Sequence, residues 1–232
     1  MTYADPQCRL IPCLWFDHQG EEAANFYVSL LPDSRIDHVT RAPDDYPGGK
    51  AGQALEIQFT LAGQPYSALN GGVTSDEALA DPFDSDVTLA RGFLSLPFLE
   101  NVITDTHFIQ RNRMGRELAF LARVAGAPLS WNAAPKGIAI SEHTAVLVDT
   151  KTGTARVIGH GPAYFLHATQ GAPNISQGQP LDMAGVTVSR WTNTTGATTL
   201  DIGAWSFPDL ASYTVNVTNG TVHSTQSNGS PY

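Results

Sequence analysis

The stretch from Asn101 to Ala125 constrains the fold most, because it joins a short apolar strand to an amphipathic helix through a highly charged turn. Asn101-Val102-Ile103-Thr104 predicts the strand. Apolar residues then recur at helical spacing, at Met114, Leu118, Leu121, Ala122 and Ala125. Between strand and helix lie an acid, a histidine and several arginines, so His107 is expected at a strand-to-helix turn.

The predicted helix has two unlike faces. Arg113, Arg116 and Arg123 fall opposite the apolar stripe, so one face suits a core and the other is cationic. A cationic face would suit carboxylates. The alternative from the residues alone is a solvated arginine face with a histidine that caps a strand.

The N-terminal third predicts a βαβββ order. Residues 10–16 form an apolar strand, and a helix with acidic residues at its start follows until Pro32 ends it. Three further strands are predicted over Arg35–Arg41, Leu55–Leu61 and Tyr66–Leu69.

Composition bounds the class of protein. The 232 residues are 42% hydrophobic and 15% charged, with a net charge of −9, which is typical of a globular chain and disfavours a nucleic-acid or membrane partner. Cys8 and Cys13 predict neither a zinc site nor a disulfide framework. The polar start lacks the features of a signal peptide, and no apolar run has transmembrane length, so we expect a cytoplasmic protein.

Residues 7–72 resemble one module of the glyoxalase/bleomycin-resistance (vicinal oxygen chelate) superfamily, in its demethylubiquinone methyltransferase-like branch. The motifs are Pro-Cys-Leu-Trp-Phe-Asp, Glu-Glu-Ala-Ala-Asn-Phe-Tyr, Leu-Pro-Asp-Ser-Arg-Ile, Phe-Thr-Leu-Ala-Gly-Gln and Ala-Leu-Asn-Gly-Gly. The family builds its site from two facing modules, so the resemblance implies a homodimer through this one. His18, His38 and Glu56 match no ligand position of metal-binding members, so we expect surface side chains, no metal and no cofactor.

Residues 73–232 resemble the C-terminal part of cyanophycinase, a serine peptidase related to dipeptidase E that cuts arginines from a polyaspartate backbone. The resemblance rests mainly on the motif Asp-x-His-Phe-x-x-Arg-x-Arg-x-x-Arg at residues 105–116. Upstream, Thr74–Leu79 and Leu94-Ser95-Leu96 resemble the segment leading to that motif, and residues 137–145 resemble the segment with the triad acid.

The resemblance implies roles for six residues. His107 would be the general base and Glu142 the acid that holds its imidazole. Arg111, Arg113 and Arg116 would bind substrate carboxylates, and Asp105 would contact an arginine side chain, so an arginine- and aspartate-containing peptide is the implied partner. Thr106 stands where the closest family pattern has Gln, which puts one substrate contact in doubt. The alternative for Glu142 is an exposed turn residue.

The nucleophile of that family is missing. It belongs to a Gly-x-Ser-x-Gly motif, which occurs nowhere in this chain. Ser67 and Ser75 are the nearest serines by position, but Ser67 lies in the glyoxalase-like strand and Ser75 in an acidic stretch. We therefore expect an inactive peptidase.

The sequence predicts a mixed α+β and α/β fold in two parts. Residues 1–72 form a glyoxalase-like βαβββ module, and residues 73–232 form a truncated α/β region with a β-rich tail, with the boundary at Gly71-Gly72. Three functions remain open: an inactive cyanophycinase-like serine peptidase fragment, a glyoxalase-like small-molecule binder or metal-dependent enzyme, and a fusion reading frame with no evolved function.

Overall fold

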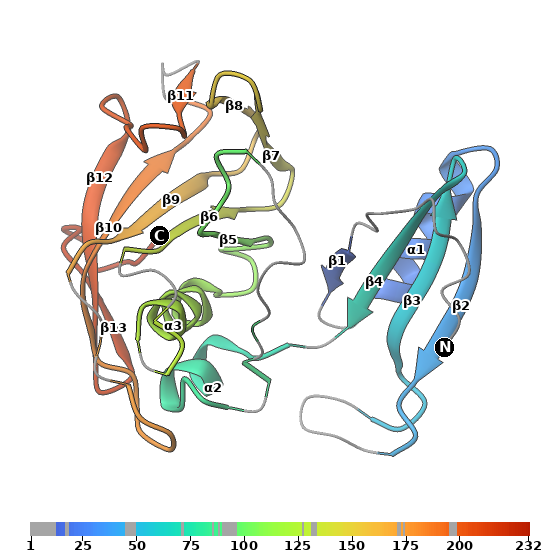
Figure 1. Cartoon of the computed structure of the whole chain (residues 1–232), viewed down its shortest axis with the longest axis horizontal. Helices are drawn as coiled ribbons and strands as arrows, with labels where there is room; N and C mark the ends of the chain where they lie inside the picture. The colour runs from blue at the N-terminus through green and yellow to red at the C-terminus, as the bar shows by residue number, and fades with distance from the viewer. Residues whose placement is uncertain are drawn as a thin grey trace. The chain divides into compact units, whose positions relative to one another are not determined.

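The structure is a computed structural model of the chain, and it divides into two compact units, Met1–Gly72 and Val73–Tyr232 (Figure 1). The structure describes residues 13–16, 19–44, 50–70, 72–84, 86–87, 89, 97–126, 128–130, 134–170, 173, 175–194 and 199–232. His18 and the Leu94-Ser95-Leu96 segment lie outside these residues.

The structure confirms the predicted βαβββ order of the first unit. Its elements are β1 (Cys13–Phe16), α1 (Gly20–Leu30), β2 (Arg35–Arg41), β3 (Ala54–Leu61) and β4 (Gln64–Asn70). The sheet has the strand order β1-β4-β3-β2, in which β1 is parallel to β4 and the other pairs are antiparallel.

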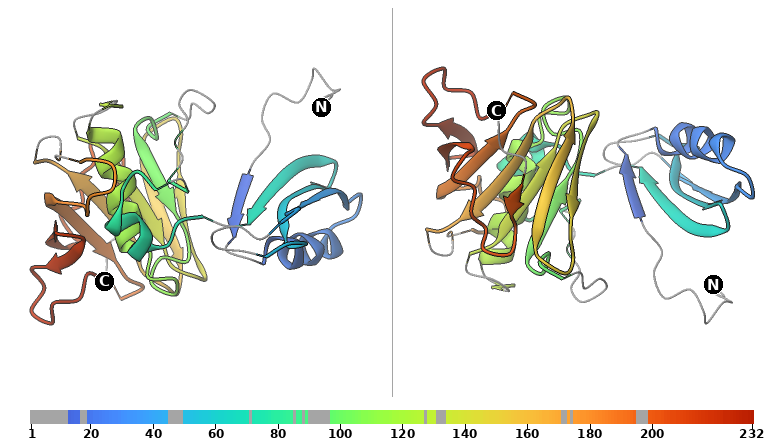
Figure 2. Two further views of the ribbon diagram at one scale, coloured as in Figure 1. Left: turned by 90° about the horizontal axis from the view of Figure 1, so that it is seen from below. Right: turned by 90° about the horizontal axis from the view of Figure 1, so that it is seen from above.

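Helix α1 covers one face of this sheet (Figure 2). Ile57 and Phe59 on β3 are completely buried in a core that also contains Ala24 of α1. Because side chains alternate along a strand, Glu56, Gln58 and Thr60 project from the opposite face. The module thus has one apolar, helix-covered face and one polar face.

The second unit is built on a six-stranded sheet with the order β13-β12-β10-β9-β6-β5. Its strands are β5 (Val102–Asp105), β6 (Lys136–Ile140), β9 (Ala163–Ala168), β10 (Met183–Trp191), β12 (Ala211–Thr218) and β13 (Thr221–Ser224). Only the β5–β6 pair is parallel among these described pairings. The remaining elements are α2 (Ser75–Ala80), α3 (Met114–Ala125), β7 (Thr144–Val148), β8 (Thr154–Gly159) and β11 (Leu200–Asp201).

A core lies on each face of the six-stranded sheet. Along β9, Tyr164 and Leu166 belong to the core that includes Leu118 of α3, whereas Phe165 belongs to a core with Ala155 of β8 and Leu200 of β11. One face is therefore packed against helices and the other against the three-stranded sheet β11-β8-β7. Strands buried on both faces are expected to be mostly apolar, and β9 is buried at five of its six positions.

The parallel pair β5–β6 positions the charged turn. Helix α3 connects the two strands, and Asp105 at the end of β5 pairs with Ala139 near the end of β6. Parallel strands place their carboxyl ends at the same edge of a sheet. The segments after β5 and after β6, which carry His107 and Glu142, therefore emerge side by side.

The fold is a sheet-rich mixture of α and β structure, as the sequence predicts at that level. The sequence did not predict helix α2, whose first turn is closed by a capping box between Thr74 and Glu77. No helix in the described residues has the length and apolar character needed to cross a membrane.

Because the units are separately compact, we expect a core mutation in one to leave the other intact. Phe59→Ala should lower the free energy of unfolding of the first unit by about 3–5 kcal/mol, since it opens a cavity in a fully buried site. Urea unfolding followed by NMR signals from each unit measures this.

Phe26→Ala is the matched control, because the Phe26 side chain is 59% exposed and its loss should change stability little. If Phe59→Ala shifted the transitions of both units equally, independent unfolding would be refuted.

Candidate functional site

The turn after β5 is shaped by backbone hydrogen bonds and left-handed residues. The Phe108 N–H donates to the Ile140 carbonyl at the end of β6, at 3.1 Å, which ties the turn to the neighbouring strand. His107 and Asn112 have φ values of 51° and 48°, and His143, beside Glu142, has 57°. Such backbone conformations are uncommon outside glycine and gather at functional sites.

His107 and Glu142 are brought together. The His107 Nδ1 lies 3.0 Å from the Glu142 Oε1, and the two side chains are 33% and 37% exposed. The hydrogen bond from His107 lowers the pKa of the Glu142 carboxyl below its usual value. An ionised carboxylate only accepts hydrogen bonds, so Nδ1 carries the proton and Nε2 is the nitrogen that can take up another. The pair has the geometry of an acid–base dyad.

Two residues that follow His107 also face Glu142. The Glu142 N–H donates to the Gln110 Oε1 at 3.2 Å. The positive charge of Arg111 contributes to the lowered pKa of Glu142, after the larger effect of His107. The turn thus interacts with Glu142 in three ways: His107 bonds its side chain, Gln110 accepts from its backbone N–H, and the charge of Arg111 acts on its carboxylate.

Asp105 is the centre of a buried ion-pair network. It is 5% exposed and accepts from the Arg116 Nε at 2.7 Å, the Arg116 Nη2 at 2.6 Å and the Arg113 Nη1 at 3.2 Å. The Thr106 N–H adds a fourth hydrogen bond at 2.7 Å. This arrangement favours a structural role for Asp105, Arg113 and Arg116, over the predicted contacts with a substrate.

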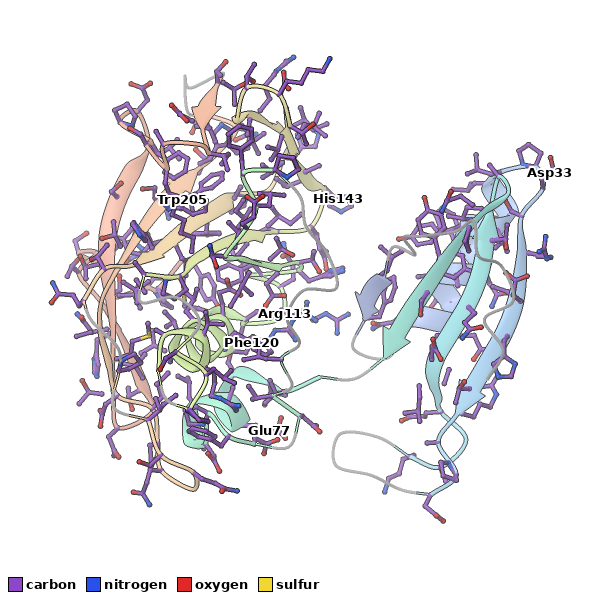
Figure 3. All side chains as sticks on the ribbon, in the orientation of Figure 1. Asp33, Glu77, Arg113, Phe120, His143 and Trp205 are labelled. Carbon is purple, nitrogen blue, oxygen red and sulfur yellow. The ribbon has the colours of Figure 1, made fainter. Side chains whose placement is uncertain are left out.

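The predicted cationic face of the helix is largely turned into the protein. Arg113 is 3% exposed and lies beside α3, as Figure 3 shows. Arg123 donates to the Pro82 carbonyl at 2.8 Å, and its guanidinium lies 4.2 Å from the centre of the Phe83 ring. These arginines fasten neighbouring segments to α3, because the chain itself supplies their acceptors.

Neither candidate serine is placed as a nucleophile. The Ser75 hydroxyl donates to the Asn112 carbonyl and accepts from the Arg116 N–H at 3.1 Å, and the residue is 6% exposed. Ser67 lies in the first unit and donates to the Glu56 Oε1 at 3.2 Å. Both hydroxyls are thus engaged in local structure.

The polar face of the first unit is the second candidate site. Glu56 accepts hydrogen bonds from Gln58 and Ser67, each at 3.2 Å, and His38 pairs with Gln58 across the β2–β3 ladder on the same face. Within the described residues, no group of three or more His, Cys, Asp or Glu side chains is placed to hold a metal ion.

Sequence reasoning missed one buried acid. Glu117 is completely buried, and neither carboxylate oxygen has a hydrogen-bond partner among the described residues. It packs over Gly137 of β6, where an added Cβ would collide with its Oε1. The sequence contained a signal for this burial, because Glu117 follows Met114 by three residues and so lies on the apolar stripe of the helix.

Comparison with known proteins gives a match to the N-terminal part of the chain. Residues 8–84 match the family model described as 3-demethylubiquinone-9 3-methyltransferase. Over these residues the chain is similar to this PhnB-like, glyoxalase-type family. The match extends past Gly72 into the second unit. The comparisons lend no support to the cyanophycinase resemblance of residues 73–232.

The solved structures similar to the chain include two bacterial proteins. A putative 3-demethylubiquinone-9 3-methyltransferase, PhnB protein, from Bacillus cereus is 18% identical, with coverage of 70% of this chain and 92% of that one and a TM-score of 0.25. A protein from Staphylococcus aureus is 17% identical, with coverages of 64% and 85% and a TM-score of 0.22. No curated protein matches the chain.

The buried Glu117 predicts a fall in stability with rising pH. Burial, and secondarily the charge of Asp105, raise the pKa of the Glu117 carboxyl well above its ordinary 4.5. A raised folded-state pKa gives stability that is complete below the unfolded pKa and is lost as pH rises to the folded pKa. The free energy of unfolding, measured by urea titration from pH 4.5 upward, should therefore fall by about 1.4 kcal/mol per pH unit between the two pKa values.

Glu117→Gln should remove this pH dependence, because a neutral amide of the same shape replaces the protonated acid. Glu100→Gln is the control for the loss of one negative charge at an exposed position. Stability curves of wild type and Glu117→Gln that ran parallel over the whole range would contradict the assignment.

Proposed function

We propose that the first unit is a small-molecule-binding module of the glyoxalase type, which completes its site by pairing with a second copy. The family match over residues 8–84 supports this function. The observation that carries it is the polar sheet face, where Glu56 is held by Gln58 and Ser67. A polar network on the open face of a sheet suits a ligand that needs hydrogen bonds.

The matched family's name indicates a first ligand to test. A soluble headgroup analogue of demethylubiquinone is a small ring with polar substituents, which the Glu56 network can orient by hydrogen bonds. We expect it to perturb the NMR signals of Glu56, Gln58 and Ser67 and to bind a dimer of the full chain. Light scattering gives the mass of that dimer.

Glu56→Gln should weaken this binding about tenfold, because it removes a charged acceptor from the site. Glu22→Gln makes the same chemical change on exposed helix α1 and should leave binding unaltered. Equal affinities of the two variants would exclude the polar face as the site, and a monomer that binds with full affinity would exclude the need for pairing.

A second function is favoured by the His107–Glu142 pair. We propose that the second unit derives from a cyanophycinase-like serine peptidase and keeps its base and acid without a nucleophile. The 3.0 Å contact supports the dyad, and the resemblance of residues 105–116 supports the peptidase origin. In this arrangement the unit binds an arginine- and aspartate-containing peptide, with Arg111 beside the dyad.

Without an activated serine, hydrolysis should be absent. Loss of the nucleophile from a triad lowers turnover about a millionfold, so we expect no arginine release from cyanophycin or from a β-aspartyl-arginine peptide. Amino-acid analysis after incubation measures release, and calorimetry with the same peptide measures binding.

Ser67→Ala and Ser75→Ala are the informative variants for any activity that is found. Turnover that one of them abolished would identify a nucleophile and refute the inactive dyad. Binding that His107→Ala and wild type shared equally would show that the peptide lies away from the dyad.

A further inference from the structure

Helix α3 begins without a side-chain cap from its own sequence. Arg113 occupies the N-cap position and makes no capping hydrogen bond with its side chain. The Met114 N–H instead donates to the Tyr232 phenol oxygen at 3.0 Å, across 118 residues of sequence. The same Tyr232 O–H donates to the Asn112 Oδ1 at 2.9 Å. One distant hydroxyl thus joins the helix start to the turn before it.

The Tyr232 ring also contacts the turn at its other end. It lies edge-on to Phe108, with ring centres 5.6 Å apart, and edge-on to Tyr164 of β9 at 6.2 Å. Phe108 is completely buried and directly follows His107. Tyr232 therefore contacts the residue after His107 and the residues that lead into α3.

The segment that carries Tyr232 is itself fastened. The Tyr213 hydroxyl donates to the Pro231 carbonyl at 2.8 Å, and the Gln226 side chain donates to the carbonyls of Ser230 and Tyr232 at 2.8 and 3.0 Å. Because its segment is held in place, the Tyr232 ring can position the residues that it contacts, Phe108 and Asn112. Burial raises the pKa of Tyr232 to about 12, so its hydroxyl keeps the proton that it donates.

We propose that Tyr232 is a positioning residue that holds the 107–113 turn so that the His107 Nδ1 stays on Glu142. The inference rests on the dyad proposed above. The turn contains two left-handed residues, His107 and Asn112, and such conformations persist only where their surroundings hold them. Tyr232 supplies that support through Phe108 and Asn112, on either side of the turn.

Tyr232→Phe tests this, because it keeps the ring and removes both hydrogen bonds of the hydroxyl. We expect the Glu142 carboxyl pKa, measured by carbon NMR titration, to rise toward its ordinary 4.5 as the His107 contact weakens. The Met114 amide should exchange about tenfold faster, since its acceptor is lost. A purely structural loss of stability would not move the Glu142 titration.

Thr225→Val is the matched control, since it removes a hydroxyl that accepts the Thr214 N–H at 3.0 Å near the β12–β13 hairpin. It should leave Glu142 unchanged. If Tyr232→Phe does not fold, Asn112→Gly tests the positioning role in its place, because glycine tolerates the φ of 48° and lacks the Oδ1 that accepts the Tyr232 O–H.

His107→Ala separates the two proposals. If it raises the Glu142 pKa and Tyr232→Phe, or Asn112→Gly in its place, does not, the dyad stands and the positioning role of Tyr232 is refuted. If His107→Ala leaves the pKa unchanged, the dyad is absent and both proposals fail.

Discussion

The second unit depends on a carboxylate buried at the end of β5. A charge at a 5% exposed position is costly unless it is paired and hydrogen-bonded, and Asp105 meets this condition with two arginines and a backbone N–H. Both arginines belong to the start of α3, so the network joins the strand to the helix. His107 lies within the segment that is closed in this way, and its position follows from the closure. Removal of Asp105 would leave two cations without their buried counter-ion.

The two candidate sites lie in different parts of their sheets, one on a polar face and the other at an edge. In the first unit, the polar face of one sheet carries a hydrogen-bonded network around Glu56, and α1 covers the other face. In the second unit, the dyad lies at the edge of a sheet that has a core on both faces. The first arrangement suits a site completed by another copy. The second joins His107 and Glu142 within one chain.

Local patterns were sufficient for the elements of the first unit and for the strand-to-helix turn of the second. Strand β2 was predicted at its observed bounds, and β3 begins one residue before its predicted start. The His107–Glu142 contact was expected from resemblance, and its physical reason is the parallel pairing of β5 with β6. Helix α2 was missed because its signal is a capping box over only six residues. Arg113, Arg116 and Arg123 were expected to form a cationic face for a ligand. A helical wheel shows which face of a helix is cationic, but it does not show which other segments of the protein cover that face.

The sequence by itself determined the βαβββ order, the strand-to-helix turn and the absence of a Gly-x-Ser-x-Gly motif, because each is a property of neighbouring residues. Only the tertiary structure decided that Arg113 and Arg116 are bound to Asp105, that Tyr232 caps α3, and that Glu117 is buried with no hydrogen-bond partner among the described residues. These contacts join residues by distance in space, and a carboxylate or hydroxyl takes whichever partner the fold brings within about 3 Å. Sequence spacing does not specify that partner.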